Sequence, residues 1–299
     1  MIQYLYLGRV NYDEALRLQA EVGDLRLRGL VENVLLLLEH PPVLTLGRNA
    51  RRANVLASEA LLASRGVTLH EINRGGDVTY HGPGQLVGYP IFDLRSLCNP
   101  ATGARLGPVD FVRLMEEALI GLCGELGVRA GRICGLTGVW CGAPRFDSLD
   151  ESCGTGRASD PPAGERKIAA IGIHVSRGIT SHGFAFNVTT NLDDFRLINP
   201  CGIIDRPVTS LAKEISDWGA GTATAEAASL DLEQVAHRAA RQFGTVFNQP
   251  VLAVASLEAL RAAVNRRAAP HSGPAEDTPL QIPLEIERLQ HKPKRPVHA

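Results

Sequence analysis

Residues 74–85 read Arg-Gly-Gly-Asp-Val-Thr-Tyr-His-Gly-Pro-Gly-Gln, with four glycines, one proline and two charged side chains in twelve positions. Glycine permits positive φ and close backbone approach, whereas proline fixes φ and removes an amide donor. We therefore expect a loop here, not the interior of a helix or strand. It is either a tight connection between strands expected at 67–73 and 86–94, or a cradle for a ligand, with Arg74 and His81 as polar contacts.

The composition is that of an ordinary soluble protein. The chain has 299 residues, 44% apolar and 21% charged, which is enough to bury a large core. A formal net charge of -1 argues against bulk electrostatic capture of nucleic acid or of an anionic membrane. The longest apolar run, Val34–Leu38, is far shorter than the roughly 18 residues of a spanning helix. Without the features of a secretory signal or transit peptide at the N-terminus, the expected compartment is the cytoplasm.

Alternating helical and extended patterns predict an α+β fold in which helices cover a mixed sheet. One catalytic domain is expected over residues 1–250, with a flexible insertion at 143–166, followed by a C-terminal extension over 251–299 that is mostly disordered from about 268. Helices are expected at 11–26, 58–65, 109–126 and 231–247, the last closing the core; the first has a capping box formed by Asn11 and Glu14. Strands are expected at 3–10, 34–39, 43–47, 67–73, 86–94, 128–133, 137–141, 167–175, 178–180 and 182–189.

Six cysteines occur, at positions 98, 123, 134, 141, 153 and 201, and no two of them form a C-x-x-C pair. A zinc site is therefore not expected, and most of the thiols are expected to be reduced. Cys201 differs from the others because it lies between proline and glycine in Asn-Pro-Cys-Gly, at a turn that leaves a thiol reachable. It is either a nucleophile or, as free cysteines usually are, a small buried hydrophobe.

Only four lysines occur, at positions 167, 213, 292 and 294. Lys167 begins the extended run Lys-Ile-Ala-Ala-Ile-Gly, where it is either a solvated strand end or a cation that serves a thiol. Lysine can lose its proton when desolvated and arginine cannot. A thiol with a pKa of about 8.5 is only a few per cent ionised near neutrality, so a neighbouring cation would stabilise the thiolate. The amine could then transfer the proton as acid and base.

Five ordered motifs resemble those of the lipoyl(octanoyl) transferases, at 39–48, 74–85, 167–172, 182–188 and 200–202. The resemblance extends over roughly residues 2 to 247. It implies the fold of the biotin and lipoate ligase catalytic domains, and a reaction that needs no cofactor and no metal. The implied donor is octanoyl-acyl carrier protein. The implied acceptors are lysines of the lipoyl domains of 2-oxoacid dehydrogenases and of the glycine cleavage H protein.

The same resemblance implies Cys201 as the acyl-thioester nucleophile and Lys167 as the partner that lowers its pKa. It implies a substrate-binding set made of Arg74, Gly75, Gly76, Asp77, Val78, Thr79, Tyr80, His81, Ala170, Ile171, Gly172, Gly183, Phe184 and Ala185. The small residues at 170, 172, 183 and 185 leave room for an unbranched chain and could expose amides to the thioester oxyanion. Outside this set, His40 is expected to pack or cap a turn, and His174 and His182 to lie on a strand surface.

Other functions remain open on the sequence alone. An ATP-dependent lipoate ligase would need an adenylate site and would not need Cys201. An amidotransferase would move octanoyl groups between proteins, also through a cysteine. A non-catalytic acyl-binding or regulatory module would need neither Cys201 nor Lys167, and no DNA-binding helix-turn-helix is evident. The insertion at 143–166 ends directly before Lys167 and is either a lid or donor-docking segment, or a tolerated surface loop.

Overall fold

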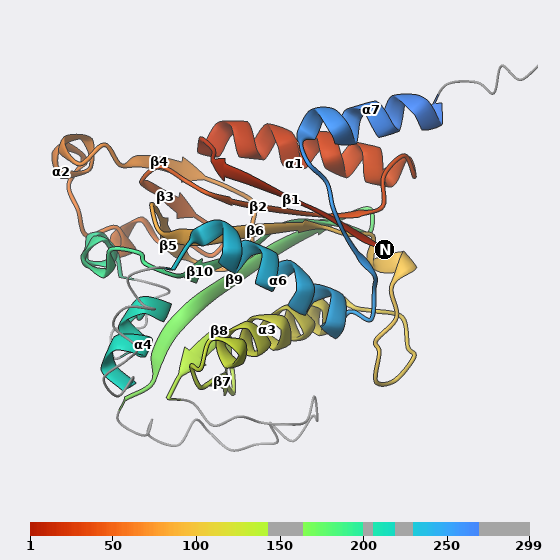
Figure 1. Cartoon of the computed structure of the whole chain (residues 1–299). Coiled ribbons are helices and arrows are strands. Elements are labelled where there is room, and N and C mark those ends of the chain that lie inside the picture. The colour runs from red at the N-terminus through yellow and green to blue at the C-terminus, as the bar shows by residue number, and fades with distance from the viewer. Residues whose placement is uncertain (143–163, 200–205, 219–229, 269–299) are drawn as a thin grey trace, which may run out of the picture.

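An eight-stranded mixed sheet organises the protein. The computed structural model describes residues 1–142, 164–199, 206–218 and 230–268. The strand order in the large sheet is β11-β1-β2-β6-β10-β9-β8-β7, and a second, three-stranded sheet has the order β4-β3-β5 (Figure 1). The α+β class and the mixed sheet expected from the sequence are confirmed.

The elements have the following bounds. The large sheet consists of β1 (Ile2–Arg9), β2 (Asn33–Glu39), β6 (Gln85–Ile91), β7 (Ala130–Ile133), β8 (Leu136–Cys141), β9 (Arg166–Ser176), β10 (Ile179–Asn187) and β11 (Val251–Ala253), and the small sheet of β3 (Val43–Leu46), β4 (Thr68–Glu71) and β5 (Val78–His81). The helices are α1 (Tyr12–Leu27), α2 (Glu59–Ser64), α3 (Pro108–Glu125), α4 (Leu211–Trp218), α6 (Leu232–Val246) and α7 (Leu257–Ala268), with 3-10 turns η1 (Arg52–Asn54), η2 (Leu94–Ser96) and η3 (Leu192–Leu197).

Strand β2 is central because both of its faces are apolar. Successive side chains of a strand point to opposite faces, so Leu35 and Leu37 join the core under α3 and α6. Leu36 and Leu38 join a second core under α1. Helices α3 and α6 therefore cover one face of the large sheet, and α1 with α7 covers the other (Figure 1).

The chain beyond residue 250 belongs to the fold as far as it is described. Strand β11 pairs in parallel with β1, with Val251 opposite Ile2. Helix α7 then buries Leu260 and Val264 in the core on the α1 side. The expectation that the helix at 231–247 is the last of the core is therefore wrong. The tail at 269–299 and residues 143–163 of the expected insertion lie outside the described residues.

Three local expectations also need correction. Residues 74–85 are not all loop, because β5 forms within them and buries Val78 and Tyr80 while pairing with β3. The strands expected at 178–180 and 182–189 are one strand, β10, paired along its length with β9. Asn11 precedes α1 with extended backbone angles, but its side chain makes no capping hydrogen bond.

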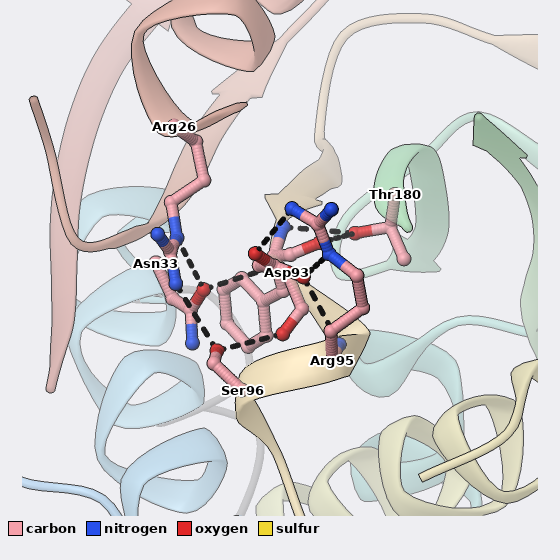
Figure 2. A network of polar contacts seen from close by, with 7 residues as sticks. Arg26, Asn33, Asp93, Arg95, Ser96 and Thr180 are labelled. Carbon is pink, nitrogen blue, oxygen red and sulfur yellow. Dashed lines mark hydrogen bonds and ion pairs between the residues drawn. The ribbon is translucent and has the colours of Figure 1, made fainter. Parts of the chain in front are cut away.

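A polar network fixes the end of β6 remote from Gln85. Arg26 of α1 donates to Asn33 of β2 at 2.9 Å, and the same Asn33 oxygen accepts from the Asp93 amide at 2.9 Å (Figure 2). Arg95 holds the Asp93 carboxylate with two 2.8 Å bonds, and Thr180 of β10 accepts from the Phe92 amide at 2.9 Å. These bonds join α1, β2, β6 and β10. They support the register of β6 and β10, which also carry residues of the candidate site described below.

Candidate functional site

A cavity of about 240 Å3 lies between residues 74–79 and strands β9 and β10. It unites segments that are far apart in the sequence. Thirteen residues expected at the site line it: Arg74, Gly76, Asp77, Val78, Thr79, His81, Lys167, Ala170, Ile171, Gly172, Gly183, Phe184 and Ala185. Its volume lies below the roughly 300–1,000 Å3 of drug-sized ligand sites, which favours a slender ligand.

One wall of the cavity is made of small residues in register. Ala170 lies opposite Ala185, and Gly172 lies opposite Gly183, on the paired strands β9 and β10. A Cβ atom on Gly172 would lie 2.6 Å from the Gly75 carbonyl oxygen, far inside van der Waals contact. Glycine at position 172 therefore allows the 74–79 segment to cross the strand closely, and the small cavity beside this crossing is here called the narrow slot.

Gly75 and Tyr80 do not line the cavity. The Gly75 amide donates to the Ile173 carbonyl at 3.0 Å, which fastens the 74–79 segment to β9. The Tyr80 ring is buried beneath the small sheet, and its hydroxyl donates to Asp194 at 2.8 Å. Both residues therefore support the cavity wall through contacts outside the cavity.

Arg74 fastens the same wall to the small sheet. Its guanidinium donates to the Thr45 carbonyl at 2.7 Å and to the Thr45 hydroxyl at 2.9 Å, and also to the Gly75 carbonyl at 3.0 Å. The residue is only 9% exposed. Its charge therefore lies at the edge of a largely apolar cavity and is bonded to protein oxygens.

His81, one of two histidines that line the cavity, is neutral. Its Nδ1 atom donates to Gln85 Oε1 at 2.8 Å, so Nε2 is left to accept from the Thr45 hydroxyl at 3.4 Å. Burial, reinforced by His40 and Arg74 nearby, lowers the pKa of His81 to about 3. His81 therefore supplies hydrogen-bonding groups, not charge, near neutral pH.

His40 supports the cavity from below, as a packing residue. Its Nδ1 atom donates to the Val10 carbonyl at 2.7 Å, and Nε2 accepts from the Tyr89 hydroxyl at 2.7 Å. Burial lowers the pKa of His40 to about 4 despite the bond to Val10. Tyr89 and Tyr12 line the cavity, and the Tyr12 ring lies 5.1 Å from that of His40.

His182 also lines the cavity, which corrects the expectation of a strand-surface residue. It is 4% exposed and adopts a left-handed φ of 55°. Its Nε2 atom bonds to Asn73 at 2.7 Å, and burial lowers its pKa to about 4. The lining residues that the sequence did not indicate are Tyr12, Tyr89, Gly135, Leu136, Thr137 and His182. Helix packing brings Tyr12 to the cavity and strand pairing brings the others; for His182, the adjoining Gly183 of the predicted set was the available signal.

Lys167 reaches the cavity from the start of β9. Its backbone amide donates to the Pro207 carbonyl at 2.9 Å, and its carbonyl accepts from Thr209 at 2.9 Å. The ammonium nitrogen lies 4.5 Å from the centroid of the Trp140 ring, a distance at which the ring face stabilises a cation. The backbone and side chain of Lys167 are thus both positioned by neighbours.

A buried chain of polar contacts links the cavity to the strand of Lys167. Gln85, which bonds to His81, donates to Asn187 at 2.9 Å, and Asn187 donates to the Thr209 carbonyl at 2.9 Å. The Thr209 hydroxyl donates to Glu214 at 2.6 Å. The wall that carries His81 and the strand that carries Lys167 are therefore held by one network.

Glu214 ends this network in an ion pair with Arg166, with bonds of 2.8 and 2.9 Å. Burial alone would raise the pKa of Glu214, but the Arg166 guanidinium and the Thr209 hydroxyl outweigh it, and the pKa is lowered. The carboxylate is therefore ionised at neutral pH, directly beside the residue that precedes Lys167.

Cys201 lies outside the described residues, but the segment that leads to it does not. The Asn199 amide donates to the Asn54 carbonyl at 2.7 Å, and the Leu197 carbonyl accepts from the Leu56 amide at 2.9 Å. Asn54 in turn donates through its side chain to Asp77, a cavity residue. The approach to Cys201 is therefore tied to the cavity wall through Asn54.

The other described cysteines differ in state. Cys98, Cys123 and Cys141 are free thiols, whereas Cys134 is disulfide-bonded, an exception to the reduced thiols expected. Burial raises the pKa of Cys123 strongly and that of Cys141 to about 12, so neither thiol is reactive near neutrality.

In the described part of the chain, no group of three or more His, Cys, Asp or Glu side chains could hold a metal ion. The described helices include none with the length and apolar character needed to span a membrane.

Known proteins with similar sequences belong to the family that the five motifs resemble. The family described as the lipoyl protein ligase A/B catalytic domain matches residues 11–244. An octanoyltransferase of Acidobacterium capsulatum is 54% identical over 255 residues, 84% of this chain and 92% of that protein. An octanoyltransferase of Koribacter versatilis is 48% identical over 289 residues, 97% of each chain.

Solved structures share the fold at low identity. The crystal structure of lipoate-protein ligase A bound with ATP has a TM-score of 0.57 at 16% identity, covering 89% of this chain and 94% of that one. The bipartite lipoate protein ligase of Thermoplasma acidophilum also has a TM-score of 0.57 at 16% identity, covering 89% and 91%. At this identity the likeness concerns the fold alone.

Proposed function

The chain belongs to the lipoyl protein ligase A/B catalytic domain family, and within it to the octanoyltransferases, and we propose that Cys201 and Lys167 carry out the transfer. Cys201 is the nucleophile that holds the octanoyl group as a thioester. Lys167 stabilises its thiolate and transfers protons. The observation that supports this most directly is that Lys167 lines the same narrow, small-residue cavity as the residues at 170–172 and 183–185.

The first half-reaction exchanges one thioester for another. The Cys201 thiolate attacks the carbonyl carbon of the octanoyl thioester, a bond to the Cys201 sulfur forms, and the bond to the donor sulfur breaks. The departing thiolate takes a proton from the Lys167 ammonium, which leaves a neutral amine. A nearby cation stabilises the thiolate, and an amine held beside the reacting sulfur can act as acid and then as base.

The second half-reaction forms an amide. The amine of the acceptor lysine attacks the enzyme thioester, the carbon–sulfur bond to Cys201 breaks, and the neutral Lys167 amine takes the proton that the attacking nitrogen loses. The thiolate and the ammonium are restored together. Because an amide is more stable than a thioester, the transfer needs no ATP.

The substrate-binding roles of the cavity residues are part of the proposal. Ala170, Gly172, Gly183 and Ala185 form the slot for the unbranched chain. Residues 74–81 form its opposite wall. Arg74 fastens this wall to the small sheet through Thr45, and Gly75 fastens it to β9 of the large sheet. The donor is octanoyl-acyl carrier protein, and the acceptor is a lysine of a lipoyl domain.

The test is mass spectrometry of the intact protein after incubation with octanoyl-carrier protein and no ATP. We expect a gain of one octanoyl group, absent in Cys201→Ala, retained in the exposed-thiol control Cys98→Ala, and lost when a lipoyl domain is added. Lys167→Met should acylate far more slowly at neutral pH and recover in part at higher pH, where the thiol ionises without help. A strict need for ATP, or full activity of Cys201→Ala, would instead identify a ligase.

A further inference from the structure

Residues 48–56, here called the arginine segment, combine exposed cations with an exposed apolar side chain. The segment reads Arg-Asn-Ala-Arg-Arg-Ala-Asn-Val-Leu, and Arg48, Arg51 and Arg52 are all exposed. Leu56 is 63% exposed, an unusual position for a large apolar side chain in this protein. Exposed arginines are enriched where proteins bind partners, and an exposed leucine in the same short segment adds apolar area that a partner can bury.

The arginine segment bonds to the cavity wall at one end and to Asn199 at the other. At one end, the Arg48 amide donates to the Arg74 carbonyl at 3.0 Å, and the Asn49 amide to the Gly76 carbonyl at 3.1 Å. At the other end, the Asn54 carbonyl accepts from Asn199, two residues before Cys201. A partner bound to this segment would therefore lie beside both the cavity wall and the approach to the thiol.

The local charge is positive although the whole chain carries -1. Arg52 pairs with Glu59 at 3.3 Å, and the Glu59 side chain is 90% exposed, so this pair is weak. Within the described residues, Arg48 and Arg51 make no ion pair. The nearby Asp77 carboxylate is bonded to the Arg51 and Val78 amides and to the Asn54 side chain, so it is directed into the segment.

We propose that the arginine segment is the docking surface for the donor, an acidic protein that presents the acyl thioester on a long flexible arm. This inference rests on the proposed function. The segment bonds to the cavity wall, but none of its residues lines the cavity. A donor with a long arm can bind there while its thioester reaches the thiol, whereas an acceptor that offers only a lysine side chain must cover the entrance itself.

Charges at the rim of an interface act mainly on the rate of encounter and on its salt dependence. We therefore expect Arg48→Gln/Arg51→Gln to lower the second-order rate of Cys201 acylation by the carrier-protein donor about tenfold at low ionic strength, and less at high salt. The matched control is Arg28→Gln/Arg241→Gln, which removes two exposed arginines, one directly after α1 and one in α6. It should acylate at the wild-type rate.

Two small donors separate the possible causes. With octanoyl-N-acetylcysteamine, which is uncharged, the double variant should equal the wild type. With octanoyl-phosphopantetheine, which carries the phosphate but no protein, it should also equal the wild type. A loss with the uncharged donor would place the arginines in the chemistry, and a loss with the phosphorylated donor would assign them to the phosphate; either result overturns the docking surface.

Leu56 gives an independent test. Leu56→Asp should repel an acidic partner and lower acylation by the carrier-protein donor at least tenfold, with no change for the uncharged donor. Val109→Asp is the control, since Val109 is 72% exposed on α3. Unchanged acylation by the carrier protein in both the Leu56 and double-arginine variants refutes the inference. A defect confined to amide formation with the lipoyl domain assigns the surface to the acceptor and also refutes it. If the wild type is acylated by no donor, the proposed function fails, and the inference with it.

Discussion

The side-chain amide of Asn187 bonds to Gln85 on one side and donates to the Thr209 carbonyl, at 2.9 Å, on the other. Asn187 is 3% exposed, so its loss leaves buried donors and acceptors without partners. We expect Asn187→Ala to lower the free energy of unfolding by about 2–3 kcal/mol. Urea denaturation measures this. Asn191→Ala, which removes an exposed side chain that accepts only from the Asp193 amide, should cost no more than about 1 kcal/mol. Equal effects of the two variants would contradict the role given to the network.

The Glu116 carboxyl group is completely buried, and it bonds to β8, the strand that pairs with the Lys167 strand β9. It accepts from Arg113 at 2.7 Å, from Arg132 at 3.1 Å and from the Gly138 amide at 2.9 Å. Glu116→Ala leaves two arginines and an amide without this partner, and should cost about 3–5 kcal/mol in urea denaturation.

The neighbouring Glu117 is the control for that experiment. It is 36% exposed and pairs with Arg132 at 2.7 Å. The pair is partly buried, but Arg132 keeps its bonds to Glu116 and to the Arg113 carbonyl, so Glu117→Ala should cost only about 1 kcal/mol. A cost for Glu116→Ala below that of Glu117→Ala would show that the buried contacts do not support β8.

Gly172→Ala tests the narrow slot. The added methyl would lie 2.6 Å from the Gly75 carbonyl oxygen, so residues 74–79 must move away from β9. We expect a cost of about 1–3 kcal/mol in stability and a raised KM for the acyl donor. Gly124→Ala in α3 adds the same methyl where no atom lies within 4 Å, and should stabilise by about 0.5–1 kcal/mol. An unchanged KM for Gly172→Ala would separate the slot from substrate binding.

The buried histidines predict how stability depends on pH. The pKa values of His40, His81 and His182 lie at about 4, 3 and 4, below the ordinary 6.5. Because the unfolded chain binds these protons and the folded protein does not, stability is complete above pH 6.5 and falls as pH decreases toward 4. Each such histidine contributes at most about 1.4 kcal/mol per pH unit in that range.

Urea denaturation at pH 7, 6 and 5 measures this slope. His81→Asn should lower stability at pH 7 yet reduce its dependence on pH, because one titrating group is removed. Asn191→Ala removes an exposed side chain that does not titrate, so it provides the control and should leave the slope unchanged. The same slope in wild type and His81→Asn would mean that His81 is not neutral in the folded protein.

The sequence predicted those helices and strands whose buried residues recur at the regular spacing of a single element. Helix α3 was predicted at 109–126 and occupies Pro108–Glu125, because its apolar residues follow helical spacing. Strand β2 was evident because an apolar run of this length is buried on both faces. The ordered motifs also predicted most of the cavity lining.

Features that depend on distant pairing were not predictable. Strand β11 has three residues, two of them exposed, and it exists because β1 lies beside it from the other end of the chain. Tyr12 belongs to a helix whose pattern indicates only a buried face, and its place in the cavity follows from the packing of α1 over β10. The left-handed angle of His182 likewise reflects tertiary contacts, including the bond from its amide to Gln19.

Gly172 and Gly183 face each other on β9 and β10, and neighbouring backbone carbonyls occupy the places of their missing side chains, so the empty space is the adjoining cavity of about 240 Å3. Elsewhere the protein fills such spaces with its own leucines and phenylalanines. Here the space is a portion of the interior that folding alone leaves unfilled. A bound acyl chain would complete the packing as a missing side chain does, so the loaded enzyme should melt at a higher temperature than the empty one.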